Sequence, residues 1–79
     1  MKIILVDDEQ ELVSTLAERL TMRGIDADWA TSGENALEKL HTATYDLAVL
    51  DMKMPKMNGL ELRKKIHAIQ PKTKYIFMT

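Results

Sequence analysis

The chain has 79 residues, of which 11 are basic and 12 acidic, and its net charge is −1. This length allows one domain, and the balanced charge gives no overall field that would favour nucleic acid or an anionic membrane as partner. No apolar run is long enough to span a bilayer, and the absence of cysteine excludes disulfides and fits a reducing compartment. The first apolar run leads straight into acids without a small-residue cleavage site, so we interpret it as a strand and expect a cytoplasmic protein.

The first two elements are predicted to be a buried strand and an amphipathic helix. Residues 3–6 (IILV) form a continuous apolar run, as in a strand covered on both faces. Residues 8–24 place apolar side chains on one helical face. Asp8 and Glu11 resemble a capping pair at the start of this helix, and Gly24 can end it in the left-handed conformation.

The remaining elements repeat this alternation of strand and helix. They are an edge strand with one wet face at 25–30, a helix after a capping box of Thr31 and Glu34, a strand at 45–51, a helix at 59–71 and a strand at 74–78. Strands that alternate with helices in this way favour parallel pairing through right-handed crossovers. The sequence therefore predicts an α/β fold with helices on both faces of a doubly wound parallel sheet.

Polar side chains stand where the predicted strands end. Asp7 and Asp8 follow the first strand, Asp51 ends the third and Thr79 ends the fourth. Ligands bind beyond the carboxyl ends of the strands in an open parallel sheet, so these side chains would meet at one rim if the first and third strands are neighbours. Carboxylates that lie close together repel one another and stay ionised together only around a cation, and such oxygen ligands suit Mg²⁺.

These residues make the chain resemble the receiver domain of two-component response regulators. The matching features are the pair Asp7-Asp8, the run Asp51-x-x-Met54-Pro55-x-Met57-x-Gly59, and the hydroxyl residue Thr79. The resemblance covers residues 1–79 and implies the flavodoxin-like strand order 2-1-3-4, as in the N-terminal portion of a receiver domain.

The resemblance also implies a phosphoacceptor signalling module and not an enzyme. It assigns the phosphoacceptor role to Asp51, which would take a phosphoryl group from a sensor histidine kinase, and makes Thr79 a hydroxyl donor to that group. It assigns ligation of Mg²⁺ to Asp8, Asp51 and the main-chain carbonyl of Lys53, with Asp7 holding a metal-bound water. No contact with nucleic acid or membrane is expected from this segment.

The sequence departs from the family's pattern after the fourth strand. Receiver domains carry a fifth strand with a lysine that contacts the phosphoryl group, and the chain stops at Thr79 before such a strand. We therefore expect a truncated receiver domain, with the fifth strand and last helices absent, that retains metal binding but is impaired in phosphoryl chemistry. The uncovered strand at 74–78 predicts self-association through its edge.

Other interpretations stay open at this point. A phosphatase of the dehalogenase type also uses a strand-end aspartate with Mg²⁺. Such enzymes have a second acid two residues after that aspartate, where this chain has Lys53. A non-catalytic, self-associating fragment is a further alternative. Asp7 and Asp8 could simply cap the following helix, and a terminal Thr79 could be frayed.

Overall fold

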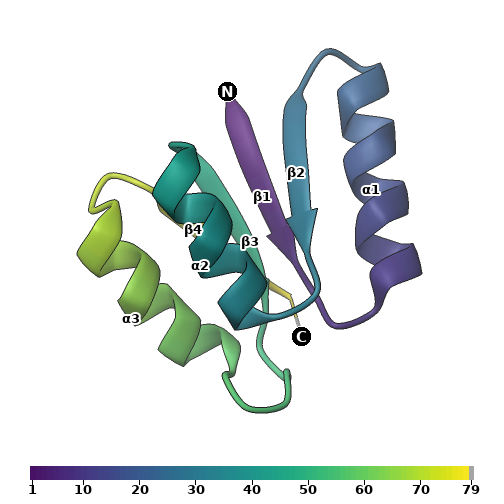
Figure 1. The fold of residues 1–79 in the computed structure, drawn as a ribbon. Coiled ribbons are helices and arrows are strands. Elements are labelled where there is room, and N and C mark those ends of the chain that lie inside the picture. The colour runs from purple at the N-terminus through teal and green to yellow at the C-terminus, as the bar shows by residue number, and fades with distance from the viewer. Residues whose placement is uncertain (79) are drawn as a thin grey trace.

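Four parallel strands form the central sheet of the computed structural model, which describes residues 1–78 (Figure 1). The strands are β1 (Lys2–Val6), β2 (Asp26–Ala30), β3 (Leu47–Asp51) and β4 (Lys74–Met78), in the order β2-β1-β3-β4. The helices are α1 (Gln10–Met22), α2 (Gly33–Thr42) and α3 (Gly59–Ile69). Helix α1 covers one face of the sheet, and α2 and α3 cover the other. The predicted doubly wound α/β fold with strand order 2-1-3-4 is therefore confirmed.

Strand β1 lies inside the sheet because both of its faces are apolar. Ile4 and Val6 pack in the larger core, under α2 and α3, whereas Ile3 and Leu5 pack in a second core under α1. Alternate side chains of a strand point to opposite faces, so only a continuous apolar run can supply two cores at once. Within residues 1–78 no helix is both long enough and apolar enough to cross a membrane.

The helix starts differ from the predicted ones. Helix α1 begins at Gln10, and its cap residue Glu9 makes no side-chain capping bond, so the predicted pair that starts at Asp8 is wrong. The carboxylate of Asp7 accepts the N–H of Glu9 at 2.9 Å, which turns the chain before the helix starts. The cap of α2 is Ser32, one residue after the predicted Thr31, and its hydroxyl accepts a main-chain N–H at 3.1 Å.

The end of α1 follows the prediction. Gly24 adopts a left-handed conformation with φ +85°, which glycine adopts without steric cost. Its N–H donates to the carbonyl of Thr21, and the N–H of Ile25 donates to that of Leu20. These bonds satisfy the last carbonyls of the helix and direct the chain into β2.

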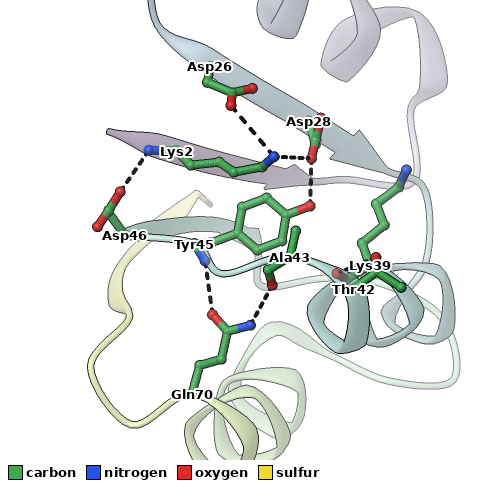
Figure 2. Close-up of polar contacts among 9 residues, drawn as sticks. All are labelled: Lys2, Asp26, Asp28, Lys39, Thr42, Ala43, Tyr45, Asp46 and Gln70. Atoms are coloured by element: carbon green, nitrogen blue, oxygen red, sulfur yellow. Dashed lines mark hydrogen bonds and ion pairs between the residues drawn. The ribbon is translucent and has the colours of Figure 1, made fainter.

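A polar network joins the amino ends of the strands (Figure 2). It lies at the opposite end of the sheet from Asp7, Asp8 and Asp51. The hydroxyl of Tyr45, a residue only 2% exposed, donates to Asp28 at 2.6 Å. The ammonium of Lys2 lies 3.5 Å from Asp26 and 3.8 Å from Asp28, and its main-chain N–H donates to Asp46 at 2.7 Å. The prediction of an edge strand at 25–30 is confirmed, but its aspartate face is only partly wet because Tyr45 and Lys2 cover Asp28.

The side chain of Gln70 ties three segments together beside this network (Figure 2). Its amide nitrogen donates to the carbonyls of Leu40 and Ala43, at 2.9 and 2.7 Å, and its oxygen accepts the N–H of Tyr45 at 2.9 Å. The hydroxyl of the buried Thr73 donates to the carbonyl of Tyr45 at 2.7 Å. The end of α2, the start of β3 and the connection from α3 to β4 are thereby held to one another.

Candidate functional site

Three acidic side chains meet at the carboxyl ends of β1 and β3. Asp7, Asp8 and Asp51 each offer a carboxylate oxygen, and these oxygens all lie within 4.8 Å of one another. The two strands are direct neighbours in the sheet, with Val6 level with Leu50, so the residues that follow them reach the same rim. The structure thus brings together the three acids that were expected to converge; we call them the acidic cluster.

The members of the acidic cluster differ in exposure. Asp7 is 7% exposed, Asp51 is half-buried and Asp8 is exposed. Burial is the main cause that raises the pKa of Asp7; the N–H of Glu9 opposes this rise, and the charges of Asp51 and Asp8 add to it. The N–H that Asp7 accepts belongs to Glu9, which precedes α1, so Asp7 stabilises the turn before the helix and does not cap it.

The loop after β3 is held against the end of that strand. The N–H of Lys53 donates to Oδ1 of Asp51 at 3.0 Å, which orients the carboxylate. A Cβ added to Gly59 would lie 2.6 Å from the main-chain oxygen of Asp51, so only glycine allows α3 to begin this close to the strand. The turn also contains a left-handed residue, Lys56, with φ 68°.

The methionine-rich loop serves packing more than chemistry. Met54 is buried in the larger core, and Met57 is partly buried and packs against this core. Asn58 caps α3, since its side chain accepts the N–H of Glu61 at 2.9 Å. This cap was not predicted from the sequence, although an asparagine before a helical pattern is a common signal for one.

The acidic cluster has no basic side chain as partner within residues 1–78. The ion pairs of residues 1–78, with nitrogen and oxygen within 4.0 Å of each other, are those of Lys2 at the other end of the sheet. The side chains of Lys53 and Lys56, near the cluster in sequence, are exposed. Three carboxylates without a protein cation form an oxygen-only set with net negative charge, which fits the ligand preference of Mg²⁺.

A hollow of the surface lies elsewhere. It has a volume of about 480 Å³ and lies between β2 and α2, and none of the three acids lines it. The candidate site is a cluster of carboxylates at the rim of the sheet, apart from this hollow. Of the other predicted site residues, Lys53 follows the cluster in the β3–α3 loop, and Thr79 lies outside the described residues.

Known proteins resemble this chain in sequence. A family model described as the response regulator receiver domain matches residues 3–79. A CpxR homolog of Haemophilus influenzae, a transcriptional regulatory protein, is 43% identical over 68 residues, which are 86% of this chain and 30% of the relative. The alkaline phosphatase synthesis transcriptional regulatory protein PhoP of Bacillus subtilis is 43% identical over 65 residues, or 82% of this chain and 27% of the relative. The chain thus spans less than a third of the length of these two relatives.

Solved structures show the same fold. The response regulator TrrA of Thermotoga maritima, in complex with Mg(2+)-BeF, superposes with a TM-score of 0.83 at 38% identity, covering 96% of this chain and 66% of that one. A CheY-like receiver domain protein from Methanospirillum hungatei superposes with a TM-score of 0.88 at 30% identity, covering 96% of this chain and 61% of that one.

Proposed function

Because the chain belongs to the response regulator receiver domain family, a family of signalling domains, we propose that Asp51 accepts a phosphoryl group from a sensor histidine kinase. The observation that carries this proposal is the meeting of three carboxylates at the carboxyl ends of two neighbouring strands. Asp51 is the member of the acidic cluster that is itself the last residue of a strand, and the N–H of Lys53 orients its carboxylate.

The chemistry assigned to Asp51 is nucleophilic attack by a carboxylate oxygen on phosphorus. A bond forms between that oxygen and phosphorus, the bond from phosphorus to the donor breaks, and the product is an acyl phosphate. The N–H of Lys53 holds Oδ1 of the carboxylate, so that the group enters the reaction in a fixed orientation.

We propose that Asp7, Asp8 and Asp51 hold Mg²⁺, together with the main-chain carbonyl of Lys53. The support from this chain is the oxygen-only donor set without a basic partner. The structure of TrrA, which carries Mg(2+)-BeF, supports the binding of Mg²⁺ by similarity. When bound, the ion would offset the negative charge of the acids and of the incoming phosphoryl group.

We propose further that the chain of 79 residues binds Mg²⁺ but accepts the phosphoryl group slowly. Transfer requires positive groups around the phosphoryl oxygens, and no basic side chain of residues 1–78 forms an ion pair with the acidic cluster.

Thr79 is proposed as a hydroxyl donor to the phosphoryl group. The kinase is proposed to dock on the exposed side of α1, and the proposal implies a cytoplasmic location.

Incubation with a small-molecule acyl phosphate and Mg²⁺, followed by intact mass measurement, tests the role of Asp51. We expect slow addition of one phosphoryl group to the wild type and to the control Asp46→Asn, which changes an acid at the other end of β3. We expect no addition to Asp51→Asn. Equal labelling of Asp51→Asn would refute the assignment, and a rate equal to that of the intact TrrA receiver would refute the impairment.

A phosphatase of the dehalogenase type is less well supported. Lys53 occupies the position where such enzymes have a second acid, and its side chain is exposed. Sustained hydrolysis of a phosphate ester, with many turnovers per chain, would support that function instead of the one proposed.

A further inference from the structure

Few hydrogen bonds hold residues 53–57, in the loop between β3 and α3 (Figure 1). Within residues 1–78, the hydrogen bonds of this segment run from the N–H of Lys53 to the carboxylate of Asp51, and from the N–H of Met57 to the carbonyl of Pro55. Neither bond reaches beyond the end of β3 to another helix or strand. Side-chain contacts must therefore fix the segment to the rest of the protein.

Two methionines supply these contacts. Met54 is 7% exposed and lies in the larger core, and Met57 is half-buried and packs against that core. The side chains between and before them, those of Lys53, Pro55 and Lys56, are exposed. The loop is thus anchored through its methionines, and a change at either of them should be felt at Lys53.

The side chain of Met57 reaches the first residue of α2. A Cβ added to Gly33 would lie 2.6 Å from Sδ, 3.2 Å from Cβ and 3.3 Å from Cε of Met57, and these are the three atoms nearest to it. Gly33 is buried, although Glu34 and Asn35 in the same turn are exposed. Met57 therefore occupies the space that a side chain at position 33 would need.

The main chain at position 33 does not itself require glycine. Gly33 has helical conformation as the first residue of α2, and among residues 1–78 the glycine with a left-handed φ is Gly24. Alanine stabilises a helix more than glycine does, so the needs of the helix do not explain a glycine here. The contact with Met57 is the physical reason that the structure offers for it.

We propose that Met57 is a positioning residue for the acidic cluster: seated on Gly33, it fixes the β3–α3 loop to α2. This contact keeps the N–H of Lys53 on the carboxylate of Asp51, and keeps the carbonyl of Lys53 where it is proposed to bind Mg²⁺. The statement about Mg²⁺ rests on the proposed function. Helix α2 supplies none of the three acids, but it contributes to the site through this contact.

A hollow beside the contact decides what a larger residue at position 33 would do. The hollow has a volume of about 240 Å³ and lies between the first turn of α2 and the loop, with Gly33, Pro55 and Met57 among its lining residues. The methionine side chain is flexible, so that of Met57 can turn into this space instead of forcing α2 away. Gly33→Ala should therefore release the loop without unfolding the protein.

Amide NMR without metal tests the positioning of the loop. The resonance of the Lys53 N–H reports on its bond to Asp51. We expect this resonance to shift in Gly33→Ala and in Met57→Ala. Met57→Leu conserves the volume of the side chain and should keep a resonance close to that of the wild type.

Calorimetric titration with Mg²⁺ tests the consequence for the site. Gly33→Ala and Met57→Ala should each weaken binding about 3- to 10-fold, which is less than the roughly 10- to 100-fold lost with a partner that bonds a metal ligand directly. Both changes remove the same contact. The double variant should therefore bind no more weakly than Met57→Ala alone.

Each substitution has a matched control. Asn35→Ala places alanine at an exposed position in the same turn of α2, and Met22→Ala removes a methionine of α1 that is 79% exposed. Both controls should keep the Lys53 resonance and the Mg²⁺ affinity of the wild type. Circular dichroism verifies that all variants are folded.

An unchanged Lys53 resonance in Gly33→Ala and Met57→Ala would overturn the proposal, and so would wild-type Mg²⁺ affinity in both variants or independent losses that multiply in the double variant. The NMR experiment needs no metal. If the wild type does not bind Mg²⁺ but the Lys53 resonance shifts as expected, the metal assignment of the proposed function is wrong and the positioning of the loop by Met57 stands.

Discussion

Replacing Asp8 by asparagine is expected to stabilise the protein without metal and to remove its response to Mg²⁺. The carboxylate oxygens of the acidic cluster lie within 4.8 Å of one another. Two unit charges at that separation repel by about 1 kcal/mol in a water-like medium, which is the appropriate limit because Asp8 is exposed. Neutralising Asp8 relieves its repulsion with both other acids, so the free energy of unfolding should rise by about 1–2 kcal/mol at low salt.

The assay is urea unfolding followed by circular dichroism, first with a chelator and then with Mg²⁺. For a domain of this size, 1 kcal/mol corresponds to a rise of about 4–8 °C in Tm, so a thermal scan can serve as a second measurement. A metal concentration about 100 times Kd should stabilise the wild type by about 2.7 kcal/mol. Asp8→Asn should gain much less, so the order of stability of the two proteins should reverse between the two conditions.

Glu18→Gln is the matched control, since it neutralises an exposed acid of α1 outside the acidic cluster. It should leave the metal-free stability nearly unchanged and the gain from Mg²⁺ intact. If Asp8→Asn lowers the metal-free stability and keeps the full gain from Mg²⁺, Asp8 serves the local structure of the β1–α1 loop, and the reasoning from charge repulsion is wrong.

Three further predictions concern residues outside the acidic cluster. Tyr45→Phe should lower the free energy of unfolding by about 1–3 kcal/mol, because the buried hydroxyl donates to Asp28, whereas Tyr75→Phe, with a 3.5 Å contact, should have little effect. Burial and then the Asp28 hydrogen bond raise the pKa of Tyr45, so stability should fall as pH rises above about 10, the pKa in the unfolded chain, and urea titrations of Tyr45→Phe should show less of this fall. Gly59→Ala should cost about 1–3 kcal/mol and weaken Mg²⁺ binding measured by calorimetry, since its Cβ would lie 2.6 Å from main-chain oxygen at the end of β3. Gly24→Ala, with φ +85° and open space around it, should cost about 1–2 kcal/mol and leave Mg²⁺ binding unchanged.

The order of elements could be predicted because each signal is local. The apolar run of β1 and the glycine at position 24 act on their own segment, whatever the rest of the chain does. The helix caps were harder, because Thr31 and Ser32 are adjacent hydroxyl residues and only the backbone conformation decides which of them caps α2. At α1 the bond from Asp7 to the N–H of Glu9 moved the helix start beyond the predicted pair.

The acidic cluster could be anticipated because strand ends in a parallel sheet share one rim. The difference in exposure between Asp7 and Asp8 could not be anticipated, since it depends on how the loop turns after β1. The network around Tyr45 gave no signal in the sequence. The hydroxyl of Tyr45 donates a hydrogen bond to Asp28, 17 positions away in the chain, and the main-chain N–H of Lys2 donates to the carboxylate of Asp46, 44 positions away. No local pattern of the sequence could reveal either contact.

The two ends of β3 are held by different kinds of hydrogen bond. One amide group fixes the start of this strand to the end of α2, so that neither segment can shift unless the connection before β4 opens as well. At the other end, the N–H of Lys53 donates to the Asp51 carboxylate at 3.0 Å, and main-chain bonds join Gly59 to Met52 at 3.4 Å and Met52 to Met78 at 3.1 Å. A change at the Asp51 carboxylate would therefore act directly on the bond from Lys53, whereas the bonds of Gln70 at the far end of the strand do not involve that group.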